Sequence, residues 1–337
     1  MSTLPRIALF GDGPWAARSL ERLAAEGYPI VGVIERVKPS DTSTFDVSRE
    51  LGVPVLRPAK ASAPEFVREL GDLGAELGLS ISYNQILRRA LLDVPRLGIL
   101  NFHAGMLPRY RGRNVINWAI INGEEEIGIT AHQVDEGIDT GAIVLQRSLP
   151  IGWTDTYGDV LRRVVDAFPA LVADAVRLVA SGEAVPVPQD ESAATYFGGR
   201  EEGDEWLDWS ATSRELHNKI RAIAHPGPGA RTLEGDRLVT IWRAYYDPAW
   251  PSYMATPGQV VGRAADGAAI VKTGDSTIRV EEVQYEGEAS GAPRWRIGTR
   301  LGVNPVRTLL GLRAELAALE KSLGATVDTG GERYGAS

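Results

Sequence analysis

The sequence predicts an α/β protein: a Rossmann-like domain with a mostly parallel sheet, followed by a small C-terminal β-barrel or β-roll of the OB-like type. Two observations lead to this prediction. Over residues 6–183, apolar strand-like runs alternate with helical patterns, an order typical of a parallel sheet covered by helices on both faces. From residue 237 on, short strand-like runs follow one another with turn residues between them, which indicates an antiparallel barrel or open roll.

The first elements are a buried strand at residues 6–11, a helix at 14–28 and a strand at 29–35. The turn between the first two contains Gly11-Asp12-Gly13, which lacks the third glycine of a dinucleotide-binding motif. We interpret it as a tight strand-to-helix turn. The further elements are expected as a helix at 62–76, strands at 77–83 and 98–103, a helix at 113–125, strands at 127–134 and 142–151, and a long helix at 157–183 disturbed by Pro169.

We divide the chain into a catalytic domain at residues 1–190, a polar, Gly-rich linker at 191–211 and a β-rich domain at 212–305. Residues 306–337 follow as an amphipathic helix with a flexible tail. The leucines of this helix, spaced near one side, cap the β-domain or pair with a second chain, and the sequence leaves both alternatives open.

Charge and composition restrict the classes of partner and site. The net charge of −8 argues against a nucleic-acid partner, because such proteins usually carry a basic face. The absence of cysteine excludes disulfides, thiol nucleophiles and thiolate metal sites, and it fits the cytoplasm, where we place the protein. No run is long and apolar enough to span a bilayer. The four histidines show no metal-ligand spacing, so we expect no metal.

The segment NFHAGMLPRYRG (101–112) holds the richest chemistry. Residues two apart in a strand share a face, so Asn101 and His103 are presented side by side near the carboxyl end of their strand. Asp139 lies in an acidic, turn-rich loop after the strand at 127–134, and it can reach His103 if the two strands are neighbours. An Asn, a His and an Asp together can stabilise a developing oxyanion.

Simpler interpretations stand beside this one. A lone histidine near a strand end is often structural, and His132 is taken as structural or as a supporting residue. Arg109, Arg111 and Arg113 form either a solvated loop or a clamp for a phosphate or carboxylate.

NFHAGMLPRYRG followed by GITAHQVDEGIDTG resembles the signature of formyltransferases that use 10-formyltetrahydrofolate, and the resemblance covers roughly residues 5–300. Ala104-Gly105-Met106 departs mildly from the family pattern. The resemblance implies that an acceptor amine attacks the formyl carbon, and that Asn101 and protonated His103 stabilise the tetrahedral oxyanion. Asp139 would keep the imidazole charged. The proton would move through a water ordered by Asp139 or through His103 itself.

The resemblance also implies that the folate is held by Asn84, Gln85, Ile86, Leu87, Asp135, Gly137 and Ile138. Because RYRGR lies beside the triad, we expect the acceptor to be held by Met106, Arg109, Arg111 and Arg113. The amino-acid sequence at residues 113–141 and 196–243 is most similar to that of enzymes that formylate nucleotide-linked amino sugars. We therefore expect a dTDP- or UDP-linked amino sugar as a small-molecule acceptor. Alternatives are an amino acid such as N-hydroxyornithine, a carrier-bound precursor, or methionyl-tRNA. A homodimer is a possible assembly in this family.

Overall fold

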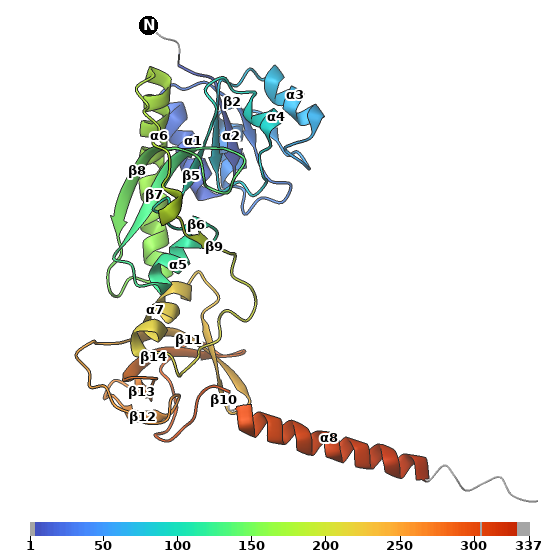
Figure 1. Cartoon of the computed structure of the whole chain (residues 1–337), viewed down its shortest axis with the longest axis vertical. Helices are drawn as coiled ribbons and strands as arrows, with labels where there is room; N and C mark the ends of the chain where they lie inside the picture. The colour runs from blue at the N-terminus through green and yellow to red at the C-terminus, as the bar shows by residue number, and fades with distance from the viewer. Residues whose placement is uncertain (1–3, 304, 329–337) are drawn as a thin grey trace, which may run out of the picture. The chain divides into compact units, whose positions relative to one another are not determined.

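The computed structural model describes residues 4–303 and 305–328. The chain divides into two compact units (Figure 1). The first contains Met1–Glu205 and His217–Gly229, and the second contains Trp206–Leu216 and Ala230–Ser337. The long helix α7 (Ser213–Ile223) therefore begins in the second unit and continues into the first. The chain is thus divided differently from our predicted boundaries, which place this helix in the β-rich domain.

A seven-stranded sheet organises the first unit, with the order β3-β2-β1-β4-β5-β7-β8. Its strands are β1 (Ile7–Gly11), β2 (Ile30–Ile34), β3 (Val55–Leu56), β4 (Leu77–Ile81), β5 (Ile99–His103), β7 (Glu126–Gln133) and β8 (Ile143–Pro150). The pairs from β3 to β5 are parallel, and β7 and β8 are added antiparallel. The predicted α/β class with a mostly parallel sheet is confirmed. A separate pair, β6 (Arg111–Gly112) and β9 (Tyr196–Phe197), joins two loops.

Helices cover both faces of this sheet (Figure 1). They are α1 (Pro14–Ala25), α2 (Ser43–Glu50), α3 (Pro64–Asp72), α4 (Arg89–Leu92), α5 (Val115–Ile121) and α6 (Tyr157–Ser181), and a 3₁₀ turn spans Glu191–Ala193. Pro169 was expected to disturb α6, but the helix continues through it. Its fully buried neighbours Phe168 and Leu171 keep this part of the helix packed, which offsets the hydrogen bond that proline cannot donate.

The hydrophobic core on one face of the sheet anchors two loops. It contains Phe10 of β1, Phe66 of α3 and Ile99 of β5. Leu87, in the loop after β4, belongs to the same cluster, and Val134, directly after β7, packs against it. Ile99 shares its face of β5 with residues 101 and 103, because side chains alternate along a strand. The two loops therefore start from the face of the sheet that carries Asn101 and His103.

The second unit contains a five-stranded antiparallel sheet with the order β10-β11-β14-β13-β12. The strands are β10 (Ala230–Glu234), β11 (Arg237–Tyr245), β12 (Val260–Arg263), β13 (Ala269–Lys272) and β14 (Thr277–Tyr285). Bridges Glu234↔Leu301 and Gln259↔Arg300 connect one segment to both edges of the sheet. The edges are thereby covered, as the prediction of a small β-barrel or β-roll requires.

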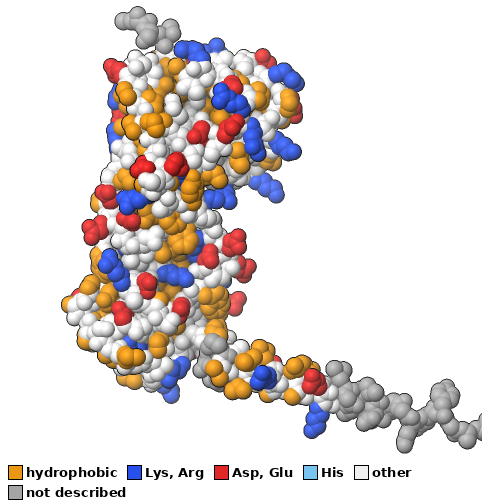
Figure 2. Space-filling view, viewed as in Figure 1, with side chains coloured by type: hydrophobic (Ala, Val, Ile, Leu, Met, Phe, Trp, Pro, Cys, Tyr) orange, Lys and Arg blue, Asp and Glu red, His pale blue; other side chains and the backbone are white. Residues whose placement is uncertain are grey.

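Helix α8 (Pro305–Asp328) presents its apolar side chains to solvent. Leu309, Leu312, Leu316 and Leu319 are 53%, 58%, 57% and 60% exposed, and Figure 2 shows hydrophobic side chains along this helix. These four leucines therefore do not cap the β-domain, which was the first of our two alternatives. The predicted flexible tail lies at residues 329–337, outside the described residues. Among the helices that the structure describes, none is long and apolar enough to cross a membrane.

Candidate active site

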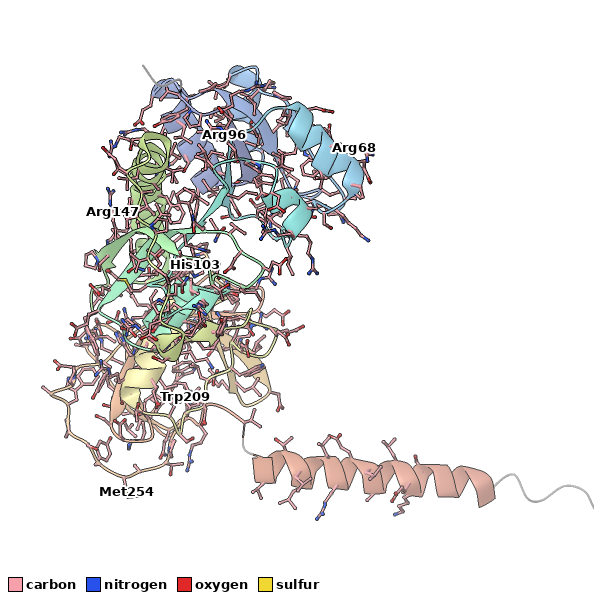
Figure 3. All side chains as sticks on the ribbon, turned by 45° about the horizontal axis from the view of Figure 1, so that its top comes forward. Arg68, Arg96, His103, Arg147, Trp209 and Met254 are labelled. Atoms are coloured by element: carbon pink, nitrogen blue, oxygen red, sulfur yellow. The ribbon has the colours of Figure 1, made fainter. Side chains whose placement is uncertain are left out.

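Asn101 and His103 lie on one face of β5, as the strand period predicts. Figure 3 labels His103 within the first unit. The neighbouring strand is β7, and its register places His132 opposite Asn101 and Thr130 opposite His103. Asn101 is partly exposed, whereas His103 is buried. The end of β5 therefore carries one accessible amide beside one imidazole that is enclosed by protein.

Asp139 lies close to these residues because β7 runs antiparallel to β5, a direction that the sequence did not predict. Because β7 is antiparallel to β5, it ends near the start of β5, and the following loop returns over the face of β5. The Asp139 carboxylate lies 3.7 Å from Nδ1 of His103 and 3.4 Å from Nδ2 of Asn101. It also accepts a 2.8 Å hydrogen bond from the backbone N–H of Gly112. The three residues proposed from the sequence thus come together in one cluster.

His132 is the fourth member of this polar cluster. Its Nδ1 lies 2.8 Å from the carbonyl oxygen of Gln133, and because a carbonyl only accepts, Nδ1 carries the proton. In the neutral ring Nε2 then accepts the 3.1 Å hydrogen bond from the Asn101 amide. Nε2 also lies 3.5 Å from the Asp139 carboxylate. From the sequence we interpret His132 only as a structural or supporting residue, and the antiparallel register with Asn101 brings it into the site.

His103 is held neutral by its surroundings. Its Nε2 lies 2.6 Å from the carbonyl oxygen of Tyr110, so this nitrogen carries a proton and donates it. Burial lowers the pKa of His103 below its ordinary value, and this outweighs the Asp139 carboxylate and the Tyr110 carbonyl, which both raise it. The expectation that Asp139 keeps this imidazole charged is therefore wrong for the free enzyme. The physical reason is that an enclosed ring loses more hydration than one carboxylate at 3.7 Å restores.

Asp139 itself stays ionised although it is largely buried. Burial raises its pKa, but the contacts with His132, His103 and the Gly112 N–H together lower it to about 2. Its backbone has φ 55°, a conformation that costs non-glycine residues free energy and persists only where neighbours hold it. Although these groups lie close together, the described part of the chain contains no group of three His, Cys, Asp or Glu residues that could hold a metal ion.

The loop after β5 closes tightly over the imidazole. A Cβ at Gly105 would lie 2.6 Å from Nε2 of His103 and 2.5 Å from the Tyr110 carbonyl oxygen, distances that no side chain tolerates. Glycine is therefore required at the position where the sequence departs from the family pattern. Tyr110 has φ 63°, and its ring stacks on Phe197 at 4.9 Å. Tyr110 is therefore fixed twice: its carbonyl oxygen contacts His103, and its ring packs on Phe197.

The three arginines of RYRGR have two different roles. Arg111 is completely buried, and its guanidinium donates hydrogen bonds to Gln189, Glu191 and Tyr196. It cannot reach an acceptor, so its assignment as a clamp residue is wrong. Arg109 and Arg113 are exposed, on either side of the segment that donates to Asp139. These two side chains remain available for an anion, and Met106 nearby is partly buried with its backbone packed on Gly128.

The loops assigned to the folate lie on the same face of the sheet as the cluster. Leu87 is buried in the core, whereas Asn84 and Ile86 are exposed. Gln85 is tied down, because its side chain accepts from the backbone of Ala61 and donates to the Pro58 carbonyl. In the second loop, Asp135 accepts from the N–H of Gly137, and Ile138 is 61% exposed.

Comparison with known proteins identifies two families along the chain. Residues 6–176 match the family described as formyl transferase, and residues 201–295 match the formyl transferase C-terminal domain. The methionyl-tRNA formyltransferase of Symbiobacterium thermophilum is 36% identical over 294 residues, which cover 84% of this chain and 89% of the relative. That of Sorangium cellulosum is 36% identical over 291 residues, covering 84% and 92%.

Solved structures show the same fold in sugar-modifying relatives. The sugar 3N-formyl transferase WlaRD, solved with dTDP and 5-N-formyl-THF, has a TM-score of 0.64 at 20% identity and covers 85% of this chain and all of its own. The N-formyltransferase of Helicobacter canadensis, in complex with folinic acid and dTDP-3-aminofucose, has a TM-score of 0.63 at 19% identity and covers 83% and 99%. At these identities the similarity shows the fold.

The pKa of the His103 imidazole can be measured by direct titration. In the folded protein we expect the imidazole pKa below its ordinary value of about 6.5, so that His103 stays neutral until the pH falls through the lowered value. Asp139→Asn removes the carboxylate that raises this pKa, so the value falls further. Nitrogen-15 NMR of the histidine rings measures both effects, with the exposed Asp166→Asn as control. A His103 pKa above 6.5 in the wild type would contradict this account.

Proposed function

This chain belongs to the formyl transferase family, and on that premise we propose that it moves a formyl group from 10-formyltetrahydrofolate to the amine of a nucleotide-activated amino sugar, linked to dTDP or UDP. One observation carries the proposal: Asn101, His103 and Asp139 form a cluster on the face of β5, beside the exposed Arg109 and Arg113. The cluster suits acyl transfer to an amine, and the two arginines suit an anionic acceptor.

The two loops fit the folate donor, which supplies an activated formyl group when bound. Ile86 and Ile138 are 62% and 61% exposed, and exposed apolar side chains on neighbouring loops suit a flat aromatic ring. Among the described residues, the peptide groups of 84–87 make no hydrogen bond with other backbone groups, so they are free for the polar edge of a pterin. We assign Asn84, Gln85, Ile86, Leu87, Asp135, Gly137 and Ile138 to this role.

Asn101 would stabilise the charge that develops on the formyl oxygen. Its Nδ2 has two N–H groups, one in the 3.1 Å contact with His132 and one in the weaker 3.4 Å contact with Asp139. The second N–H can be exchanged for an oxyanion at small cost. The first contact keeps the amide in orientation while this happens, so His132 acts as a positioning residue.

His103 would accept the proton that the attacking amine loses and return it to N10 of the folate, which needs a proton when its bond to the formyl carbon breaks. Its Nε2 proton is committed to the Tyr110 carbonyl, which leaves Nδ1 as the basic atom, on the side of Asp139. A neutral imidazole can take a proton, whereas the charged ring expected from the sequence cannot. When His103 becomes charged, the Asp139 carboxylate at 3.7 Å stabilises it. This choice favours direct relay by His103 over relay by a water.

The acceptor is proposed from the distribution of charge. Arg109 and Arg113 are exposed next to the cluster and can bind a diphosphate. The chain as a whole carries a net charge of −8, and residues 212–305 hold basic and acidic side chains in near balance. A small anionic acceptor needs only local cations, whereas tRNA binding draws most of its affinity from an extended basic surface. The similar fold of enzymes solved with dTDP supports the same choice.

Methionyl-tRNA is the second candidate acceptor. It is favoured by the relatives of that name, which are 36% identical over 84% of this chain. The two candidates separate in one assay. The purified chain is incubated with 10-formyltetrahydrofolate and, in turn, dTDP-linked and UDP-linked amino sugars and methionyl initiator tRNA, and the formylated product is measured by mass spectrometry.

We expect formylation of an amino-sugar nucleotide and none of the tRNA. His103→Ala and Asn101→Ala should each lower kcat by about 10²- to 10³-fold, the range for losing a general base or an oxyanion donor. Circular dichroism checks that both variants fold. Product from methionyl-tRNA alone would make the sugar acceptor wrong, and full activity of His103→Ala would make the mechanism wrong.

The two exposed arginines should act on the acceptor alone. Arg109→Ala and Arg113→Ala remove charge-assisted hydrogen bonds, so each should raise the acceptor KM by about tenfold or more, with kcat and the donor KM nearly unchanged. Arg68→Ala, an exposed arginine on α3, is the matched control (Figure 3). Steady-state kinetics with each substrate varied in turn measures the effect. Unchanged acceptor KM in both site variants would remove the arginines from the acceptor site.

We further propose that α8 pairs with α8 of a second copy, giving a homodimer. Leu309, Leu312, Leu316 and Leu319 are spaced three and four residues apart, the pattern of a two-stranded coiled coil, and all are more than half exposed. The charges favour an antiparallel pair. With Leu316 against Leu319 of the partner subunit, Arg313 lies near the partner's Glu320, whereas a parallel pair would place Glu315 near the partner's Glu320.

The pairing of α8 has a matched test. Leu316→Ser lies on the proposed seam, and Leu310→Ser, equally exposed at 58%, lies off it. Size-exclusion chromatography with light scattering should find dimers for the wild type and Leu310→Ser, and monomers for Leu316→Ser at the same concentration. A monomeric wild type, or equal effects of the two changes, would contradict the pairing.

A further inference from the structure

Gln189 connects the loop that carries Asp139 to the buried arginine of RYRGR. Its Nε2 donates to the carbonyl oxygens of Asp139 and Gly141, at 2.8 and 2.7 Å. Its Oε1 accepts from Nε and Nη2 of Arg111, at 3.1 and 2.8 Å. The side-chain amide thus uses both of its N–H groups and both lone pairs of its oxygen.

Arg111 determines which way this amide points. A guanidinium only donates, so the oxygen of Gln189 must face Arg111 and the NH₂ must face the two carbonyls. Arg111 is itself fixed, because its side chain is fully buried and also binds Glu191 and the Tyr196 hydroxyl. The buried guanidinium of Arg111 therefore determines the orientation of the Gln189 amide.

Asp139 is held by hydrogen bonds from two different segments. Gly112, next to Arg111, donates its N–H to the carboxylate, and Gln189 binds the main-chain carbonyl. A residue at φ 55° keeps that conformation only if its surroundings over-determine it. Two independent contacts, one on the side chain and one on the backbone, supply this restraint.

We infer that Gln189, oriented by Arg111, is a positioning residue that holds Asp139 over His103 and Asn101. The catalytic consequence rests on the proposed function, since it assumes that Asp139 serves the charge on His103. The geometric consequence does not. Arg111, which cannot bind the acceptor directly, thereby acts on the reaction through Gln189 and Gly112.

The variant Gln189→Glu distinguishes a role in the stability of the fold from a role in positioning the loop that carries Asp139. The carboxylate still accepts from Arg111, but it has no N–H, so an oxygen faces the carbonyls of Asp139 and Gly141. We expect a thermal midpoint close to that of the wild type and a fall in kcat of about 10- to 100-fold, the loss typical of a misplaced catalytic group. Gln189→Ala should lower kcat in the same way. The control is Asp190→Ala, an adjacent exposed residue whose side chain accepts from Ser192.

The titration of the Asp139 carboxyl is the readout that a merely structural role would not move. In Gln189→Glu and Gln189→Ala its pKa should rise from about 2 toward 3.8, because the contacts with His132 and Gly112 loosen. Carbon-13 NMR measures this without either substrate. If both variants kept the Asp139 pKa and the kcat of the wild type, the inference would be wrong. If the wild type formylates no acceptor, the proposed function fails, and the titration still decides whether Gln189 positions Asp139.

Discussion

The ionised state of Asp139 is the constraint on which the rest of the site depends. Burial alone would raise the pKa of this carboxyl, and the contacts with His132, His103 and the Gly112 N–H reverse that effect. A buried charge without such partners costs several kcal/mol, so the elements that supply them must keep their relative positions. The carboxylate in turn cannot overcome the burial of His103. The result is one neutral imidazole beside one charged carboxylate, which suits proton acceptance better than a preformed ion pair does.

The part of the site that follows from local periodicity was predictable. Asn101 and His103 share a face because a strand repeats every two residues, and no tertiary contact is needed to see it. The direction of β7 was not predictable, because an apolar alternation looks the same in a parallel and an antiparallel strand. That direction brings His132 opposite Asn101 and sends the loop with Asp139 back over β5.

The RYRGR segment shows where periodicity fails. Residues 109, 111 and 113 are two apart, so an extended strand would present all three arginines on one face. Tyr110 at φ 63° and Gly112 at φ 97° interrupt the alternation and turn only the middle arginine inward. Its partner Gln189 lies 78 residues away in the chain, and a contact of that span leaves no local signal in the sequence. Backbone turns and distant partners, which a single sequence does not encode locally, therefore decided the role of Arg111.

The residues proposed for the two substrates differ in their surroundings. The loops that we propose for the folate rest on the core of the sheet, where Leu87 and Ile99 belong to one buried cluster. Arg109 and Arg113, which we propose for the acceptor, are exposed charges on a loop. Changes in a core disturb packing, whereas an exposed loop changes its side chains at little cost to the fold. One fold can therefore keep its formyl chemistry while its acceptor varies, which explains why relatives named for a tRNA and for a sugar resemble the same chain.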